Sequence, residues 1–296
     1  MEEISVCICT FRRPGLLRKL LDELGGQQTE GLFSFSIVVA DNDGSQSAQP
    51  VVSEFAASSS IRVTYCHEPR QNIALARNAA LANARGDFIA FIDDDEYPAK
   101  DWLSSLFKTW KATGADGVLG PVKPYFDQEP PKWATQGRFF ERPRHETGHK
   151  VGLTDARTGN VLFRRQILSG EGEAFRPQFG TGGEDVDFFR RMMERGRVFV
   201  WCDEAIVYEI VPASRCSRSY LLRRALLRGR NSLKPRTGRL RNVFRSLIAV
   251  PAYSLVLPFF FVTGNHHFMK YLIKLCDHAG RLLALLGLNP VKERDL

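Results

Sequence analysis

The feature that most constrains the fold is a series of short apolar runs that alternate with helical segments in the first third of the chain. The runs are rich in β-branched and aromatic residues, and each ends in polar, turn-forming residues. Strands that alternate with helices pair as a mostly parallel sheet with helices on both faces. The sequence therefore predicts an α/β fold with strands at 4–9, 35–40, 61–66 and 88–92.

The segments between and after these runs predict the helices. Leucines at helical spacing follow Pro14, residues 73–85 are rich in alanine and lack Gly and Pro, and residues 101–112 begin at Asp101, a favourable N-cap. The proline-rich segment 121–157 favours an irregular loop. Further strands are predicted at 160–163, 198–202 and 205–211, and a further helix at 184–194.

The apolar run at 88–92 ends directly in four acids, Asp93 to Glu96. Carboxylates this close repel one another, so the cluster is stable only where water solvates it or a cation neutralises it. A solvated turn is the plain alternative, because strand ends reach the surface. Ligands of such sheets bind outside the carboxyl ends of the strands, where Thr10 and Asp41 also fall. This shared edge favours a ligand site that includes a metal.

The net charge of +8 is unevenly distributed along the chain. Residues 1–212 carry 25 Lys and Arg against 30 Asp and Glu, whereas residues 213–296 carry 16 against 3. The densest part, 213–245, has eleven basic residues and no acid, which predicts a polyanionic neighbour. An anionic membrane leaflet fits better than nucleic acid, because the first part is net acidic and the basic residues alternate with leucines rather than aromatic residues.

The C-terminal region has the pattern of a membrane-associated segment. From Tyr220 onward leucines interleave with arginines, as in helices that lie on membrane surfaces. Residues 246–264 carry no charge but contain Pro251 and Pro258, so they can span a membrane marginally, form a re-entrant or interfacial helix pair, or pack on the main domain. Residues 268–288 are again amphipathic. We expect a main domain at 1–212 and a basic, apolar helical region at 213–296, with residues 213–288 on an anionic membrane surface.

Other motifs argue against other classes of protein. The six cysteines form no CxxC pair and indicate a reduced, cytosolic chain, and the N-terminus has no secretory signal pattern. The glycines at 180–183 lack the spacing of a dinucleotide site. His145 and His149 lack an HExxH context and are interpreted as loop residues. Tyr125 and Trp133 in the proline-rich segment can stack on a sugar or pack the loop.

Five stretches together carry a family resemblance. They are residues 5–14 (SVCICTFRRP), 39–43 (VADND), 72–78 (NIALARN), 91–96 (FIDDDE) and 182–188 (GGEDVDF). In this order the chain resembles the inverting family 2 glycosyltransferases of the GT-A fold over about residues 4–231, and is most similar to bacterial exopolysaccharide glucosyltransferases of the succinoglycan type. The resemblance implies a Rossmann-like, mostly parallel sheet flanked by helices, with a nucleotide-sugar donor.

The resemblance implies roles for the acids after the fourth strand. Asp93 faces the nucleotide sugar, and Asp95 with Asp93 holds Mn²⁺ or Mg²⁺, hard cations that suit carboxylates and phosphate oxygens. Asp94 departs from the simplest family pattern, and its part in binding donor or metal stays open. Other donor contacts implied by the family pattern are Thr10, Arg12, Asp41, Arg77 and Asn78.

On the acceptor side, Asp185 matches the family's catalytic base. Inversion needs one carboxylate that takes the proton of the attacking hydroxyl. Glu184 is a candidate sugar or acceptor contact, and Trp133 a candidate acceptor platform. The acids at 184, 185 and 187 can also serve only to stabilise a helix N-terminus.

The predicted function is therefore metal-dependent transfer of a hexose, with UDP-glucose favoured, to a lipid-linked or polysaccharide acceptor in exopolysaccharide or cell-surface glycan biosynthesis. The expected location is the cytoplasmic face of the inner (plasma) membrane, peripheral or shallowly inserted. Alternatives within the class are polyprenyl phosphate, protein or small-molecule acceptors. The alternative outside it is a non-catalytic membrane-surface binding module.

Overall fold

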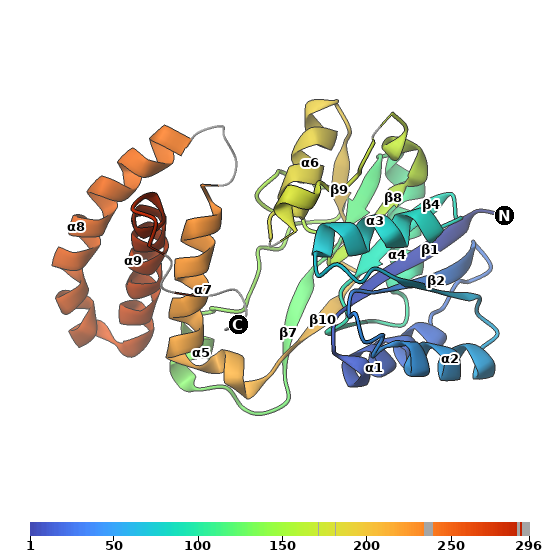
Figure 1. Ribbon diagram of the computed structural model, residues 1–296, viewed down its shortest axis with the longest axis horizontal. Helices are drawn as coiled ribbons and strands as arrows, with labels where there is room; N and C mark the ends of the chain where they lie inside the picture. The colour runs from blue at the N-terminus through green and yellow to red at the C-terminus, as the bar shows by residue number, and fades with distance from the viewer. Residues whose placement is uncertain (171, 181, 234–238, 289–290, 292–296) are drawn as a thin grey trace. The chain divides into compact units, whose positions relative to one another are not determined.

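The computed structural model describes residues 1–170, 172–180, 182–233, 239–288 and 291. The chain forms two compact units: Met1–Lys123 with Arg142–Glu209, and Pro124–Glu141 with Ile210–Leu296. We call them the first and the second unit (Figure 1). The predicted C-terminal region at 213–296 includes positions 234–238, 289–290 and 292–296, which lie outside the described residues. Pro124–Glu141 groups with the C-terminal region in the second unit, which was not predicted from the sequence.

A seven-stranded sheet forms the centre of the first unit, in the order β3-β2-β1-β4-β8-β6-β9. Four neighbouring pairs are parallel, and β8 runs antiparallel to both β4 and β6. The predicted mostly parallel sheet is confirmed, with β8 as its antiparallel member. Its strands are β1 (Glu3–Thr10), β2 (Ser34–Asp41), β3 (Val63–His67), β4 (Phe88–Ile92), β6 (Gly117–Leu119), β8 (Asn160–Arg164) and β9 (Phe199–Trp201).

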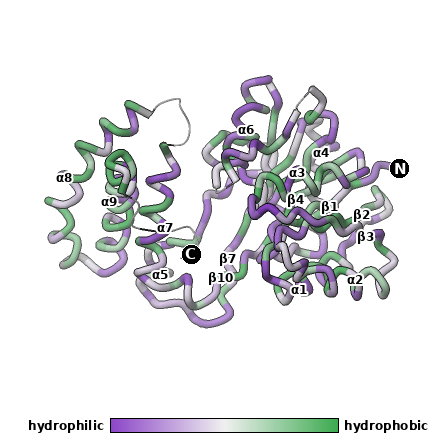
Figure 2. The backbone as a smooth tube through the Cα atoms, viewed as in Figure 1, coloured by the Kyte–Doolittle hydropathy of each residue, from purple (hydrophilic) through white to green (hydrophobic). Residues whose placement is uncertain are grey.

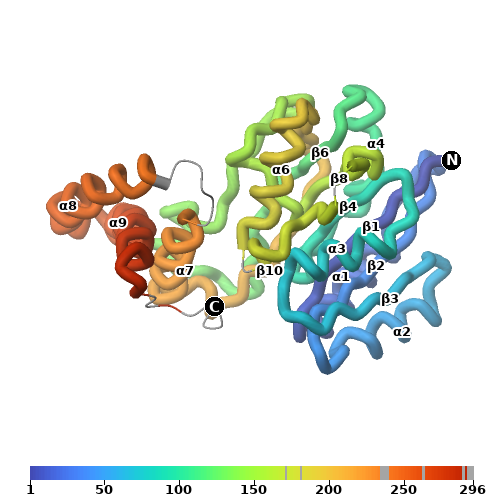
Figure 3. The backbone as a smooth tube through the Cα atoms, turned by 45° about the horizontal axis from the view of Figure 1, so that its top comes forward, coloured from blue at the N-terminus to red at the C-terminus, as the bar shows by residue number. Residues whose placement is uncertain are grey.

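Helices cover both faces of this sheet because side chains alternate along each strand. Ile4, Val6 and Ile8 of β1 join one core cluster with residues of α1, α2 and α4, whereas Cys7 joins the other with residues of α3 and α6. Figures 1 and 3 show the course of these helices around the strands. The helices are α1 (Pro14–Gly25), α2 (Gln49–Ser58), α3 (Ile73–Asn83), α4 (Trp102–Thr113) and α6 (Glu184–Glu194).

Several local predictions need correction. Helix α2 was not predicted, because only Val52 of its residues is buried and an apolar stripe is missing. The segment 121–157 is not wholly irregular, since it contains β7 (Val122–Phe126) and α5 (Lys132–Gln136). Strand β7 belongs to a three-stranded sheet, ordered β5-β10-β7, with β5 (Glu96–Pro98) and β10 (Val207–Val211). Asp101 stands at the N-cap of α4 but makes no side-chain capping bond.

The second unit is helical in its C-terminal part. Helix α9 (Asn265–Leu285) packs against both α7 (Arg218–Asn231) and α8 (Arg239–Thr263). Two glycines allow α7 and α9 to approach closely: a Cβ on Gly229 would lie 2.0 Å from the Asp277 carbonyl oxygen, and one on Gly280 would lie 2.2 Å from that of Leu226. Small residues at a helix contact are common where helices pack without a large water-excluded core.

Helix α8 presents an apolar stripe to its surroundings. Leu240, Phe244, Leu247, Leu255 and Phe259 recur at helical spacing, and all are exposed, Leu255 by 83%. Figure 2 shows apolar residues along both α8 and α9. By length and composition alone, the segment Leu240–Phe261 can cross a membrane. Its mean hydropathy reaches 1.7, and only 6% of its most apolar stretch is buried. The buried side of α8 includes Ser246.

Candidate active site

The candidate site lies beyond the carboxyl ends of β1, β2 and β4. Thr10 and Asp41 end β1 and β2 and are paired in register. The Thr10 hydroxyl donates to Asp94 Oδ2 at 2.8 Å, so the loop after β4 is bound to the end of β1. The structure thus brings Thr10 and the acidic cluster together at one edge of the sheet.

Arg13 is the first basic partner of the cluster, and the sequence did not single it out. Its Nη1 donates to Asp94 Oδ1 at 3.0 Å and to Asp95 Oδ2 at 3.1 Å. Arg12, the residue chosen from sequence, has a φ of +55° and donates from Nε to Asp43 Oδ1 at 3.1 Å instead. The sequence indicated only that one of two arginines, Arg12 or Arg13, could face the acids. Which of them faces the acids depends on the left-handed turn at Arg12.

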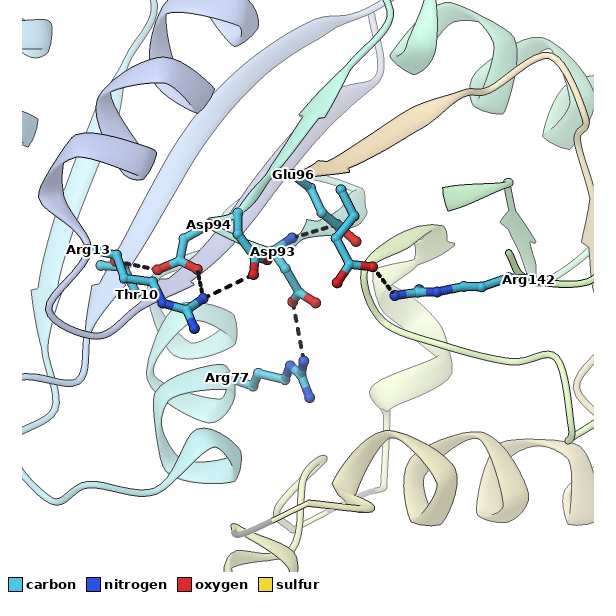
Figure 4. A network of polar contacts seen from close by, with 9 residues as sticks. Thr10, Arg13, Arg77, Asp93, Asp94, Glu96 and Arg142 are labelled. Atoms are coloured by element: carbon cyan, nitrogen blue, oxygen red, sulfur yellow. Dashed lines mark hydrogen bonds and ion pairs between the residues drawn. The ribbon is translucent and has the colours of Figure 1, made fainter. Parts of the chain in front are cut away.

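Arg77 on α3 connects the cluster to the first turn of α6. Its guanidinium pairs with Glu184 through Nη1. Through Nη2 it pairs with Asp93 Oδ1 at 3.5 Å (Figure 4). The side chains of Arg77 and Glu184 are 8% and 7% exposed. Burial lowers the pKa of Arg77. Glu184 and Asp93 raise this pKa, and the net shift is upward, so the guanidinium stays charged. Arg77 is therefore a fixed cation between two acidic elements.

Burial makes the acids of the site costly to ionise. It raises the pKa of Asp94 to about 6, against the opposing effects of Arg13 and of the Thr10 hydroxyl. It also raises the pKa of Asp93 and of Glu96, whose carboxylate accepts the Asp93 N–H at 3.0 Å. Carboxylates with raised pKa values favour a cation that allows them to ionise together.

A third arginine reaches the cluster from a distant segment. Arg142 donates from Nη2 to Glu209 Oε2 at 2.5 Å (Figure 4). Burial lowers the pKa of Arg142, and Glu209, Glu96 and Asp93 raise it more strongly. The sequence missed Arg142, because a lone arginine in a proline-rich segment gives no local sign of its partners.

Asp185 lies in the first turn of α6, after Gly182 and Gly183, which have φ values of +117° and +93°. Its carboxylate is half-buried and accepts the Val186 N–H at 2.7 Å through Oδ1. The neighbouring Glu184 has a raised pKa, with burial as the main cause, and its Oε2 is buried without a hydrogen-bond partner among the residues that the structure describes. Asp187 differs, because Arg190 and Arg191 bind its buried carboxylate.

Asp41 and Asn78, which the sequence predicts to contact the donor, form hydrogen bonds within the protein. The buried carboxylate of Asp41 accepts N–H groups of Asp43 and Ala48 at 3.0 and 2.9 Å and the Tyr65 hydroxyl at 3.1 Å. The Asn78 amide donates to the Phe175 carbonyl at 2.7 Å and accepts its N–H at 2.9 Å. The first bonds shape the loop after β2, and the second hold the segment before α6 on α3. The predicted donor contacts of Asp41 and Asn78 remain predictions.

Trp133 belongs to α5 of the second unit and is not part of this cluster of contacts. Its ring lies 5.7 Å from that of Phe139, and the Arg218 guanidinium lies over it at 5.7 Å. These contacts fit the plainer of the two interpretations, in which the tryptophan packs its own segment. Its role toward an acceptor remains a prediction.

The donor atoms of the cluster fit a hard divalent cation. Asp93 and Asp95 supply carboxylate oxygens. Gly159 lies close to Asp93 and Glu96, since a Cβ there would lie 3.2 Å from Asp93 Oδ2 and 2.8 Å from Glu96 Oε1. Within the described ranges, no three His, Cys, Asp or Glu side chains gather in an arrangement that would hold a metal alone. Proteins hold Mg²⁺ and Mn²⁺ through one or two carboxylates plus substrate phosphates.

A mostly parallel sheet of this order, with acids beyond β4 and an acidic first turn on α6, defines a glycosyltransferase of the GT-A class. Residues 5–170, more than half of the chain, match the family model described as Glycosyl transferase family 2. The chain belongs to this family, and the protein is a glycosyltransferase.

Similar proteins support this assignment. The chain is 34% identical over 302 residues to the succinoglycan biosynthesis protein ExoM of Rhizobium meliloti, covering 98% of this chain and 95% of that protein. Solved structures share the fold. TarS 1–349 of S. aureus in complex with UDP-GlcNAc has a TM-score of 0.55 at 14% identity, over 97% and 93% of the two chains. The mannosyltransferase PcManGT of Pyrobaculum calidifontis in complex with GDP-Man and Mn²⁺ has a TM-score of 0.56 at 17% identity, over 99% and 77%.

Proposed function

We propose that this glycosyltransferase moves a hexose from a nucleotide sugar, with UDP-glucose favoured, to a hydroxyl of a lipid-linked or polysaccharide acceptor, with inversion at the anomeric carbon. The observation that carries the proposal is the chain of ion pairs from Asp93 through Arg77 to Glu184. These ion pairs connect Asp93, the acid predicted to face the donor, with α6, the helix that carries Asp185. The similarity to a succinoglycan biosynthesis protein supports a place in exopolysaccharide or cell-surface glycan biosynthesis.

On the donor side, the chain's own groups meet the charge of a diphosphate. Arg77 is a buried cation that faces the acidic cluster, and a guanidinium binds phosphate oxygens with two parallel hydrogen bonds. Asp93 and Asp95 would hold Mn²⁺ or Mg²⁺, which neutralises charge on the leaving diphosphate when bound. A cation in this position is supported by the close approach of acidic groups, since the buried Glu96 carboxylate accepts the Asp93 N–H at 3.0 Å and the pKa of both acids is raised.

On the acceptor side, the Asp185 carboxylate takes the proton of the acceptor hydroxyl. The acceptor oxygen then forms its bond to the anomeric carbon while the bond from that carbon to the diphosphate oxygen breaks. The pair of electrons leaves with the nucleoside diphosphate. One carboxylate suffices for this single displacement, unlike the pair that glycosidases need. The buried Oε2 of Glu184 is available to a sugar or acceptor hydroxyl next to this base.

The decisive experiment compares Asp185→Asn with Glu194→Gln, which removes an exposed carboxylate at the far end of the same helix. Asp185→Asn should lower the rate of transfer by about 10²–10⁴-fold, the usual contribution of a general base, with donor affinity retained. Glu194→Gln should leave both unchanged. Transfer is measured as nucleoside diphosphate release from a panel of nucleotide sugars with Mn²⁺ or Mg²⁺, and full activity of Asp185→Asn would refute the base assignment.

We propose further that the protein acts at the cytoplasmic face of the inner membrane, held by the second unit. Helix α7 carries five arginines and no acid, and the apolar stripe of α8 is exposed. Basic residues near anionic lipids and apolar residues in the interface strengthen each other in membrane binding. Membranes washed first with high salt and then with detergent test this. Release by salt alone would show that α8 does not insert.

A further inference from the structure

The arrangement of Arg13 differs from that of Arg77. A single nitrogen, Nη1, bridges two carboxylates, Asp94 at 3.0 Å and Asp95 at 3.1 Å (Figure 4). These side chains are only 7% and 13% exposed, whereas that of Arg13 is 42% exposed. The guanidinium therefore covers the acids from the solvent side.

The backbone of Arg13 is held at the start of α1, whereas its side chain reaches the solvent. Arg13 is the N-cap of α1, with Pro14 as the first helical residue, and its carbonyl accepts the N–H groups of Leu16 and Leu17 at 3.1 and 3.0 Å. Its side chain makes no capping bond. Arg77 contrasts with it, since that side chain is 8% exposed and lies between Asp93 and Glu184. The bridge of Arg13 can open toward solvent without a change in the main chain.

The position of this bridge coincides with the proposed cation site. Asp95 is the expected metal ligand, and one of its oxygens accepts a hydrogen bond from Arg13. A guanidinium and a divalent cation cannot both occupy the same face of one carboxylate, because like charges a few ångströms apart repel strongly in a partly buried site.

We propose that Arg13 is an internal counter-cation for Asp94 and Asp95, which holds the pair while metal and donor are absent and leaves Asp95 when they bind. This inference rests on the proposed metal role of Asp95. Released from Asp95, the Arg13 guanidinium is free to face the phosphates of the donor. Arg13 is thus a positioning residue that sets how tightly the free enzyme binds its cation.

The test measures Mn²⁺ affinity of the full-length protein, first without nucleotide and again in the presence of a nucleoside diphosphate, using the electron paramagnetic resonance signal of free Mn²⁺. Arg13→Gln should bind Mn²⁺ about tenfold more tightly than the natural protein, since a competing charge within a few ångströms is removed. The matched control is Arg18→Gln, which removes an exposed arginine of the same helix that pairs with Glu54. It should bind Mn²⁺ as the natural protein does. The Mn²⁺ affinity of Arg13→Lys should lie between those of Arg13→Gln and the natural protein, because lysine keeps the charge but lacks the planar guanidinium.

A second readout covers the case in which Arg13→Gln folds poorly. Its thermal midpoint in EDTA should be lower than that of Arg18→Gln, and Mn²⁺ should raise it by more. A purely structural role for Arg13 would lower the midpoint without tightening Mn²⁺ binding, which would overturn the inference. Asp95→Asn separates the two proposals. If it weakens Mn²⁺ binding while Arg13→Gln does not tighten it, only the inference fails, whereas unchanged binding in Asp95→Asn refutes the metal assignment and the inference with it.

Discussion

The two units use arginine in opposite ways. In the first unit, Arg13 and Arg77 pair with carboxylates of the acidic cluster, and Arg142 pairs with Glu209 next to it. In the second unit, α7 carries five arginines without one acid of its own, and Arg228 finds its partner, Asp277, on α9. In the first unit these arginines are paired with acids of the same unit. The second unit carries an excess of basic residues, which fits the proposed anionic membrane surface.

The same contrast holds for apolar side chains. The large apolar residues of the first unit's strands are buried on both faces of the sheet. Those along the stripe of α8 are exposed. A folded unit that buries its apolar groups and pairs its charges is organised around a ligand within it. One that exposes both kinds of group is organised around a surface.

Arg77→Met should break the internal pairing of the first unit. It would leave the buried Glu184 without its cation, and removal of one partner from a buried pair costs about 3–5 kcal/mol in unfolding free energy. Chemical denaturation measures this loss. The matched control is Arg85→Met, an exposed arginine just after the same helix, which should change stability little.

A double variant sharpens the result. Arg77→Met with Glu184→Gln removes the orphaned charge as well as the cation, so part of the lost stability should return. Equal instability of the single and double variants would mean that Arg77 contributes through packing, for example its contact with the Phe175 ring, rather than through the ion pair.

The fold of the first unit could be predicted because its information is local. Each strand at 4–9, 35–40 and 88–92 is an apolar run that ends in turn residues, and each lies within a strand of the sheet. The antiparallel direction of β8 and the strand β7 could not be predicted. Both depend on pairing with segments distant in sequence, and pairing rather than propensity decides such strands.

The site shows the same limit at the level of side chains. Residue type and position relative to a strand end were enough to select Thr10, Arg77 and the acids at 93–95, which the structure brings together. They were not enough to select Arg13 over Arg12, because one left-handed residue decides which side chain faces the cluster. Arg142 lies 46 positions after Glu96 in the printed sequence, and only the folded chain brings it near the cluster.

The exposed stripe of α8 provides the next test. Leu255→Glu and Phe259→Glu should each weaken binding of the full-length protein to anionic vesicles by about tenfold or more, since burial of such a side chain is worth about 1.5–3 kcal/mol. Both side chains are exposed, by 83% and 66%, so folding should be unaffected. Vesicle sedimentation measures binding. Ala57→Glu, the same charge change at an exposed position of α2, serves as the control, and equal weakening in that variant would contradict the assignment of the surface to α8.

The smallest expected effect concerns pH, and it has opposite signs in the two units. Burial disfavours the charged form in both, so it raises the pKa of the acid Glu184 and lowers the pKa of the base His278. A raised acid pKa makes folding less favourable as pH rises. A lowered histidine pKa makes folding less favourable as pH falls below about 6.5, where the unfolded chain takes up a proton that the folded chain resists.

His278 offers the cleaner measurement because its surroundings are defined. Its Nδ1 lies 2.9 Å from the buried Ser246 hydroxyl and 3.3 Å from Arg281 Nη1. A protonated imidazole would be repelled by the cations of Arg281 and Arg245, and both lower the pKa of His278. Asp277 has the opposite effect and raises it. Amides of α8 and α9 should therefore exchange hydrogen faster at pH 5 than at pH 7.5, after correction for intrinsic rates. His278→Gln keeps a polar side chain without the titration and should remove the difference. If the difference persists in that variant, another group destabilises α8 and α9 at low pH. The opposite pH dependence of the two units would then not be due to His278.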